Sequence, residues 1–319
     1  MQNEILHIVT QVSNPIRWKS RNALARAAVL DWLNEPNVQV TLVECQNGTR
    51  SYQLEDLAGH ARVTHVPVRA TTMAWSKENL ANIGISRLPQ SAQYIGTFDA
   101  DIHFRKAGWA TEIMHALQLY PVIQPWKTAY DLGPNDEHLS AFKSFASQFH
   151  KGANVIPRFD PKTLQLTNSP YDYPHPGYAW AWTRKTLDRV GGLFEDGGMG
   201  SGDHIMALAL IGRVEAAVPR GVDPAFMAIA KAWQATALSQ VNKRLGYAHQ
   251  TIEHQFHGAK KNRGYNSRWG MFLEHNFNPI TDLKKNSYGV IEFSGNKPEL
   301  ERLWDNYLRS REEDANTTA

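Results

Sequence analysis

Only one cysteine, Cys45, occurs among the 319 residues, so no disulfide can form within the chain. No apolar run approaches the roughly 18–20 residues that a membrane-spanning helix needs. Residues 1–6 are acidic and lead directly into a predicted strand, unlike a signal peptide. We therefore expect a cytoplasmic protein without a transmembrane segment.

The composition and the position of the glycines argue against a disordered chain and against a glycine-rich phosphate loop after the first strand. Charged residues make up 20% of the chain, too few for a disordered protein, and hydrophobic residues make up 42%, enough for a sizeable core. The net charge of +3 suits partners that carry phosphate but does not single out nucleic acid. Residues 10–15, after the first predicted strand, contain no glycine, so the sequence offers no glycine-rich phosphate loop at that point.

Apolar segments of strand and helix length alternate in the first 120 residues. Alternation of this kind predicts an α/β fold with a Rossmann-like, doubly wound sheet, whose ligands bind beyond the carboxyl ends of the strands. Pro36 and Pro89 mark where two of the helices end. The predicted strands are 5–9, 38–43, 63–68 and 94–98, and the predicted helices are 16–33, 77–85 and 107–119.

The pattern changes after residue 130. Residues 131–176 are rich in proline, asparagine, aspartate and aromatic residues, so we expect an insertion or lid there. Regular patterns return as strand 178–182, helices 184–190, 203–211 and 224–245, and strand 247–256. We expect one catalytic domain over residues 1–275, and a C-terminal extension over 276–319 that packs on it and frays from residue 311.

Two carboxylates follow the predicted strand 94–98. Asp99 and Asp101 are spaced i, i+2, so one can reach a metal ion while the other reaches a ribose or a water. Hard divalent cations take oxygen ligands, and the phosphates of a nucleotide supply the remainder. The alternative is a pair of capping aspartates at a strand–helix junction.

The start of the helix predicted at 77–85 offers groups for a nucleotide. Trp75 is suited to stacking on a base, Lys77 to facing a phosphate, and Asn79 or Asn82 to hydrogen-bonding a sugar. An ordinary capped helix start is the alternative.

Six glycines stand within residues 191–202 and lead to Asp203 and His204. Glycines let the backbone approach a ligand closely. Because Asp203 opens a predicted apolar helix, it is either a helix cap or a general base.

Two histidines, His254 and His257, stand at the end of the last predicted strand and precede a basic stretch that includes Lys260 and Arg263. Imidazole combined with carboxylate oxygen suits manganese better than calcium, and the cations suit a pyrophosphate. Ordinary surface or core histidines are the alternative.

Taken in order, these four segments resemble the GT-A glycosyltransferases, which combine an aspartate-x-aspartate strand end, a glycine-rich acidic loop and a C-terminal histidine. The spacing of Trp75, Lys77, Asn82 and Gly84 ahead of the aspartates is similar to that of the β1,4-galactosyltransferase group. That group's Trp-Gly-Gly-Glu-Asp loop is matched loosely by residues 200–204, where the tryptophan is missing.

Residues 4–314 as a whole resemble an uncharacterised bacterial and phage set of family-two-like glycosyltransferases. The matching segments are Ser13-Asn14-Pro15, His175–Ala181, Gly202-Asp203-His204 and His257-Gly258. The resemblance implies a GT-A fold and a metal-dependent, inverting transfer of a sugar from a nucleotide-sugar donor, such as a UDP-sugar, to a hydroxyl group.

The resemblance also implies roles for residues of this chain. Asp101 ligates Mn²⁺ (or Mg²⁺), Asp99 binds the ribose or the metal, and His257, or else His254, completes the metal shell. Asp203 is the catalytic base, and His204 orients it or contacts the acceptor. The donor-binding residues are Trp75, Lys77, Asn79, Asn82, Asp99, Lys260 and Arg263; Trp180 and Trp182 form a sugar-stacking wall, unless they are core aromatics.

Two other functions stay open at this point. One is a nucleotidyltransferase, which would normally carry the glycine-rich loop that residues 10–15 lack. The other is a non-catalytic carbohydrate-binding protein on the same fold. The acceptor is equally open between a glycan, a protein, a small molecule and modified DNA.

Overall fold

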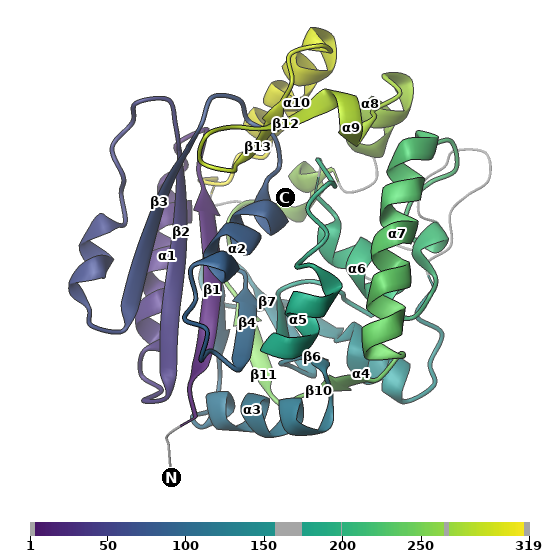
Figure 1. Cartoon of the computed structure of the whole chain (residues 1–319). Helices are drawn as coiled ribbons and strands as arrows, with labels where there is room; N and C mark the ends of the chain where they lie inside the picture. Colours follow the sequence, from purple (N-terminus) through teal and green to yellow (C-terminus); the bar gives the residue numbers. More distant parts are fainter. Residues whose placement is uncertain (1–3, 157–173, 199, 265–267, 316–319) are drawn as a thin grey trace.

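The computed structural model describes residues 4–156, 174–198, 200–264 and 268–315. Within these residues a mixed sheet of seven strands forms the centre, in the order β10-β6-β9-β4-β1-β2-β3 (Figure 1). Strand β9 is antiparallel to its neighbours β4 and β6, and the other pairs are parallel. The strands are β1 (Leu6–Ser13), β2 (Val38–Asn47), β3 (Val63–Ala70), β4 (Tyr94–Phe98), β6 (Val122–Gln124), β9 (Ala179–Thr183) and β10 (Leu245–Tyr247).

Helices cover both faces of this sheet. Along β1, Ile8 packs in a cluster with residues of α1 and α3, while Val9 packs in a cluster with residues of α2, α5 and α6. Successive side chains of a strand point to opposite faces, so β1 is apolar on both. The helices are α1 (Lys19–Trp32), α2 (Lys77–Ser86), α3 (Trp109–Leu119), α5 (Arg184–Val190), α6 (Gly202–Leu210) and α7 (Pro224–Val241), the last of which packs on α5 and α6.

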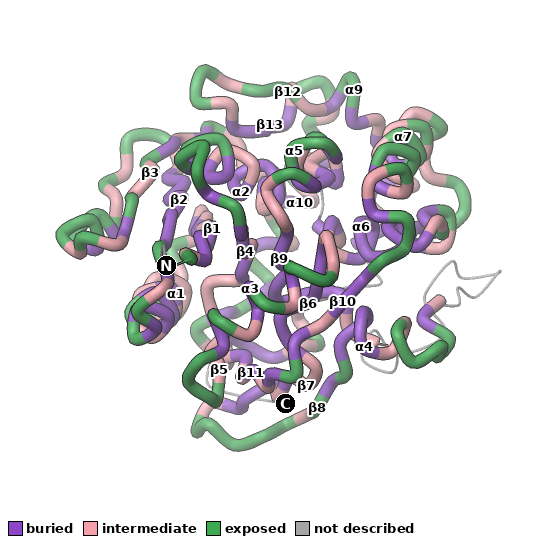
Figure 2. Tube along the Cα trace, turned by 60° about the horizontal axis from the view of Figure 1, so that its bottom comes forward, coloured by how far each residue is buried: buried purple, intermediate pink, exposed green. Residues whose placement is uncertain are grey.

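The predicted α/β class, with a Rossmann-like mixed sheet flanked by helices, is confirmed. The elements expected at 94–98 and 184–190 have the same bounds in the structure, whereas β2 and β3 run a few residues past their predicted ends. Figure 2 shows the central strands buried between helices whose outer sides are exposed. No helix in the described part of the chain combines the length and apolarity needed to cross a membrane.

Helix α2 lies unusually close to the sheet. At Gly84 a Cβ atom would be 2.5 Å from Val9 Cγ1 and 2.9 Å from Val43 Cγ2, so no side chain fits there without displacing one of them. The absence of a side chain lets the helix rest directly on β1 and β2. Its first turn, which begins with Lys77, therefore reaches the carboxyl ends of these strands.

A second sheet continues from the end of β4. Its order is β5 (Ile102–Phe104), β11 (Thr251–His254), β7 (Thr128–Leu132) and β8 (His138–Lys143). Strand β11 joins β5 to β7, and so brings the histidine segment beside the chain that follows the two aspartates.

This second sheet corrects two expectations. The start of the expected irregular insertion, 131–176, is a β7–β8 hairpin followed by α4 (Phe145–His150). The strand expected over 247–256 is two strands, β10 and β11, which belong to different sheets. These strands have three to six residues, and such short segments carry too little alternation to be recognised. Residues 157–173 of the expected insertion lie outside the described residues.

The C-terminal elements lie together beyond one end of the sheet, at the top of Figure 1. They are α8 (Arg268–Glu274), α9 (Pro279–Asp282), β12 (Leu283–Lys285), β13 (Ile291–Phe293) and α10 (Pro298–Ser310). The fraying expected from residue 311 is not observed at Arg311 and Glu313, which are 6% and 3% exposed. Ion pairs hold them in place, and residues 316–319 lie outside the described residues.

Candidate active site

A cavity of about 250 Å³ opens where β1 and β4 end. It is walled by the loop after β1, the start of α2, the loop after β4, the start of α6 and the segments around residues 254–263 and 308–313. Binding at the carboxyl ends of parallel strands is typical of α/β sheets. The sequence-predicted residues that line it are Trp75, Lys77, Asp99, Asp101, Asp203, His204, His254, His257, Lys260 and Arg263.

Asp101, His254 and His257 come together at one side of the cavity. The Asp101 carboxylate lies 3.7 Å from His254 Nε2 and 3.2 Å from His257 Nε2. One ligand atom from each of the three side chains lies within 4.8 Å of the other two. The expected proximity of the strand-end aspartates to the histidines, more than 150 positions away, is therefore confirmed for Asp101.

Both histidines have a carboxylate on the ring nitrogen that points away from Asp101. His254 Nδ1 lies 2.8 Å from Asp131 Oδ1, and Asp131 is buried and also accepts the Tyr178 hydroxyl at 2.7 Å. His257 Nδ1 lies 3.8 Å from Glu313 Oε2. A carboxylate behind a histidine favours a proton on the nearer nitrogen and leaves the farther nitrogen as a metal ligand.

The donor set fits a divalent transition metal. The two Nε2 atoms, of His254 and His257, face each other at 3.3 Å. If both Nδ1 atoms carry protons, the two Nε2 lone pairs face each other, and positive charge is needed beside them; in this structure Arg263 Nη2 supplies it, 3.1 Å from His257 Nε2. The buried Asp101 Oδ1 has no hydrogen-bond partner among the described residues, as a ligand atom would in the absence of its metal. One carboxylate and two imidazoles suit Mn²⁺ or Zn²⁺ better than Ca²⁺.

Burial keeps these two imidazoles neutral. Desolvation, supported by the neighbouring Arg263 guanidinium, lowers the pKa of His257 to about 4. Burial also lowers the pKa of His254 to about 4. Because both pKa values lie well below 7, the two rings are neutral at neutral pH, and neutral imidazole is the form that binds metals.

Arg263 and Lys260 approach the same three residues. Arg263 Nη2 donates toward His257 Nε2 at 3.1 Å, and Lys260 contacts Asp131 and sits over the Phe142 ring, 4.2 Å from its centroid. Burial, together with Arg263, lowers the pKa of Lys260 to about 7. Arg263 therefore places a fixed positive charge beside the cluster, suited to a diphosphate ligand, and Lys260 is only partly protonated at neutral pH.

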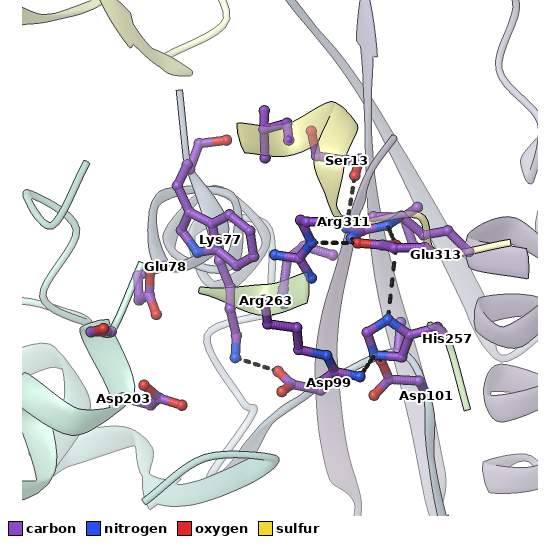
Figure 3. Close-up of a pocket in the computed structure, with 18 of the residues that line it drawn as sticks. Ser13, Lys77, Glu78, Asp99, Asp101, Asp203, His257, Arg263, Arg311 and Glu313 are labelled. Carbon is purple, nitrogen blue, oxygen red and sulfur yellow. Dashed lines mark hydrogen bonds and ion pairs between the residues drawn. The ribbon is translucent and has the colours of Figure 1, made fainter. Parts of the chain in front are cut away.

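Asp99 has a different partner from Asp101. Its Oδ1 lies 2.5 Å from Lys77 Nζ, and Figure 3 shows this pair between Asp203 and Glu78 on one side and Asp101 and His257 on the other. Burial alone would lower the pKa of Lys77, but the charges of Asp99 and Asp203 outweigh it and raise that pKa. Asp99 was predicted to bind either the ribose or the metal, and it is not part of the cluster of Asp101, His254 and His257.

Asp203 stands at the first turn of α6, where its Oδ1 accepts the backbone N–H of His204 at 2.8 Å. Burial would raise the pKa of Asp203, but Lys77 and His175 outweigh burial and lower it. The carboxylate is therefore ionised at neutral pH. Burial lowers the pKa of the adjacent His204 to about 4, so that imidazole is neutral.

Two of the predicted donor-binding residues, Asn79 and Asn82, do not line the cavity. The Asn82 side chain exchanges hydrogen bonds with the backbone of Leu193, at 2.8 and 3.0 Å. Both amides donate to Glu195 Oε2, and Asn79 also bonds the backbone at 289 and 291. In this structure the two amides therefore hold the glycine-rich loop and the C-terminal extension against α2.

Neither tryptophan of the predicted sugar wall lines the main cavity, although Trp180 lines a small adjoining cavity with Lys77, Asp99 and Asp203. Trp182 is fully buried in β9, and Trp180 is 3% exposed with its indole N–H bonded to the Pro176 carbonyl at 2.8 Å. Strand β9 pairs with β4 and β6 inside the sheet, and its alternate side chains pack in the two clusters of helix residues on opposite faces. Of the predicted aromatic residues, Trp75 lines the main cavity, beside Trp18, Tyr178 and Trp269, and the Arg311 guanidinium lies 5.2 Å from the centroid of the Trp75 ring.

Several lining residues were not predicted. Glu78 follows Lys77, and burial raises its pKa to about 7, with Asp203 adding to the effect and Lys77 opposing it. Asp131, which does not line the cavity but contacts His254, could have been identified as an acid that interrupts an apolar strand, whereas Glu313 lies in a charged run without any such signal. The other acidic, basic or histidine side chains at the cavity are Arg21, His175, Arg268, Arg311 and Glu313.

Comparison with known proteins gives no family model and no curated sequence that matches the chain. Three solved structures resemble it at low similarity. Mannosyltransferase PcManGT from Pyrobaculum calidifontis, in complex with GDP-Man and Mn²⁺, is 14% identical with a TM-score of 0.37, over 65% of this chain and 52% of that one. TarS from S. aureus is 8% identical with a TM-score of 0.41, over 87% of this chain and 45% of that one.

The third structure is 4-diphosphocytidyl-2C-methyl-D-erythritol synthase from Anaerococcus prevotii. It is 10% identical with a TM-score of 0.38, over 73% of this chain and all of that one. The chain spans about half the length of PcManGT and of TarS. At this level of similarity the functional argument comes from the residues of the chain itself.

Proposed function

We propose that the protein is a metal-dependent glycosyltransferase of the GT-A type, which moves a sugar from a nucleotide-sugar donor to a hydroxyl group with inversion. The observation that carries the proposal is the convergence of Asp101, His254 and His257 at the carboxyl end of β4. Carboxylate, imidazole and nearby cations together match a metal that carries a diphosphate.

The residues present would hold the metal through Asp101 and the Nε2 atoms of His254 and His257. The bound ion supplies Lewis-acid charge that offsets the negative charge on a departing diphosphate. Lys77 and Arg263 add fixed positive charge from α2 and from the segment after β11. Such preorganised charge stabilises the leaving group more strongly in a buried site than in water.

Asp203 is the general base of the proposal. It lies across Lys77 from Asp101 and His257 in the view of Figure 3, and it is held at the first turn of a buried helix. The Asp203 carboxylate removes the proton from the acceptor hydroxyl as the oxygen bonds to the anomeric carbon. The bond from that carbon to the diphosphate oxygen breaks, and the diphosphate leaves with the electron pair. Attack opposite to the leaving group inverts the configuration.

Trp75 offers a flat face at the cavity wall for a base or a sugar ring. Gly200, on the loop before α6, makes the close approach to it: a Cβ there would be 3.2 Å from Trp75 Nε1. The Gly200 backbone has φ +90°, which only glycine adopts readily. The glycine therefore lets the loop that carries Asp203 lie against the ring.

A donor screen tests this function. The protein is incubated with Mn²⁺ and individual UDP- and GDP-sugars, and released nucleoside diphosphate is quantified by mass spectrometry. We expect Mn²⁺-dependent release from one class of donor, lost in Asp101→Ala and retained in Asp188→Asn, whose carboxylate pairs with Arg184 on the exposed side of α5. Pyrophosphate release from a nucleoside triphosphate would instead indicate a nucleotidyltransferase, and no binding of nucleotide or Mn²⁺ would indicate a binding module.

A further inference from the structure

The segment Arg311–Asp314, here named the C-terminal strap, follows α10 and closes one wall of the cavity. Its two ends are anchored differently. Asp314 accepts the backbone N–H groups of Lys19 and Ser20, both at 2.8 Å, at the start of α1. The residue before that helix, Trp18, makes no side-chain cap, so the strap supplies the missing acceptor.

Of the three acids in the C-terminal strap, Glu312, Glu313 and Asp314, Glu313 is the one that lines the cavity. It is 3% exposed, and its carboxylate accepts Arg21 at 2.9 Å through Nε and Arg311 at 2.7 Å. Both guanidinium groups form ion pairs with this buried carboxylate. An ionised carboxylate is thus fixed in place at the back of the site.

This carboxylate faces His257. Glu313 Oε2 lies 3.8 Å from Nδ1, on the side of the ring opposite to Asp101, as Figure 3 shows. The distance is longer than a hydrogen bond but short enough for a charge in a buried site to bias where the ring proton resides. At Nε2 the nearest groups are Asp101, His254 and the donating Arg263.

The backbone beside His257 is shaped to receive the C-terminal strap. Gly258 has φ +86°, and a Cβ on it would lie 2.9 Å from the Glu312 carbonyl oxygen and 3.2 Å from the Arg311 carbonyl oxygen. A side chain at this position would lift the strap from the histidine segment. The glycine that follows His257 therefore has a steric role in the contact between His257 and Glu313.

We propose that Glu313 is a positioning residue, which holds His257 with its proton on Nδ1 and so keeps Nε2, which accepts from Arg263 in this structure, as the atom that binds the metal. The inference rests on the proposed metal site. It adds that the site is complete only when the C-terminal strap is seated, because the strap brings the carboxylate that selects this tautomer. Asp131 plays the same part for His254 from β7.

The test compares Mn²⁺ affinity, measured by electron paramagnetic resonance on metal-free protein, in wild type, Glu313→Gln, Glu313→Asp and Asp314→Ala. Loss of an outer-shell partner typically weakens metal binding about 10–100-fold. We expect that loss in Glu313→Gln and a partial recovery in Glu313→Asp, which restores the charge. Asp314→Ala is the matched control, because it removes the cap on α1 but keeps the ion pairs of Glu313 with Arg21 and Arg311 that seat the strap beside His257; it should lower Tm and keep near wild-type Mn²⁺ affinity.

Two results would overturn the inference: Glu313→Gln binding Mn²⁺ as wild type does, or Asp314→Ala weakening binding as much. Should Glu313→Gln fail to fold, ¹⁵N NMR of histidine-labelled wild type with Zn²⁺ decides the question. The inference requires His257 to carry its proton on Nδ1, and a metal on Nδ1 contradicts it. If the wild-type protein binds no Mn²⁺, the proposed metal site is refuted as well. If wild type and Glu313→Gln bind Mn²⁺ equally tightly, only this inference is refuted.

Discussion

Lys77 and Asp99 meet in the cavity with 2.5 Å between Nζ and Oδ1, one from the first turn of α2 and the other from the residue after β4. The sequence places them 22 positions apart and predicts both as donor ligands, but it does not show that they bind each other. An anionic ligand that enters the site competes with Asp99 for the ammonium group. We therefore expect that, when a donor binds, the Lys77 ammonium group leaves the Asp99 carboxylate and contacts a phosphate instead.

The first prediction concerns that exchange. Lys77→Met should weaken binding of a nucleoside diphosphate about 10–100-fold, because a hydrogen bond between charged groups contributes about 1.5–3 kcal/mol. Affinity is measured by calorimetry in the presence of Mn²⁺. Lys106→Met, which removes an exposed lysine before α3, should bind as wild type does. Equal affinity in wild type and Lys77→Met would show that Lys77 serves only to pair with Asp99.

The second prediction concerns the base. Asp203→Asn should keep donor and metal binding but reduce turnover about 10²–10⁴-fold, the usual contribution of a positioned base. The amide has nearly the same shape but cannot accept the proton. Single-turnover kinetics with a saturating donor provide the measurement. A near wild-type rate in Asp203→Asn, or a product that keeps the donor's anomeric configuration, would rule out this assignment.

The third prediction concerns pH and the buried acid Glu78. Because burial raises its pKa to about 7, the folded protein holds a proton at Glu78 that the unfolded chain releases near its ordinary value. Stability from this group is complete below the unfolded pKa and is lost as pH rises through about 7. Glu78→Gln should therefore gain on the order of 1–3 kcal/mol relative to wild type between pH 5 and pH 8. Denaturant unfolding at both pH values measures it, and an unchanged difference between the two proteins contradicts the shift.

The fourth prediction separates the observed role of Asn82 from the one inferred from sequence. Asn82→Ala removes hydrogen bonds to Leu193 and Glu195 and should lower the free energy of unfolding by about 1–3 kcal/mol. Nucleoside diphosphate affinity should stay near that of wild type, because the amide does not line the cavity. A stable variant with poor affinity would restore the donor-binding role.

Strands β1, β2, β4 and β9 were predictable because they are mostly buried runs of apolar residues, whereas β6, with three residues, was not predicted. The residues that follow β4 could be identified as site residues by their carboxylates. The second sheet was not, since β7, β8 and β11 are short and acquire their order only from one another. The contacts of Asn79 and Asn82 could not be predicted either, because a side-chain amide can hydrogen-bond a sugar or a backbone group equally well.

Long-range partners explain most of the site that the sequence did not reveal. Asp131 and Glu313 face the two histidines from segments 123 and 56 positions away, and no local pattern connects such pairs. Trp180 and Trp182 were open between a sugar wall and a core; Trp182 is fully buried, whereas Trp180, 3% exposed, also lines the small cavity beside Asp203. By contrast, the two histidines could be linked to Asp101 in advance, because metal chemistry demands that such ligands meet.

The most direct test of the account is a Mn²⁺ titration of metal-free wild type and Asp101→Ala. Asp101 is the one carboxylate among the described residues that reaches both histidine Nε2 atoms. The account predicts one bound Mn²⁺ per wild-type chain, and in Asp101→Ala a loss of affinity beyond the about 10–100-fold expected for an outer-shell partner. Equal Mn²⁺ affinity in the two proteins, or no binding by wild type, would contradict it.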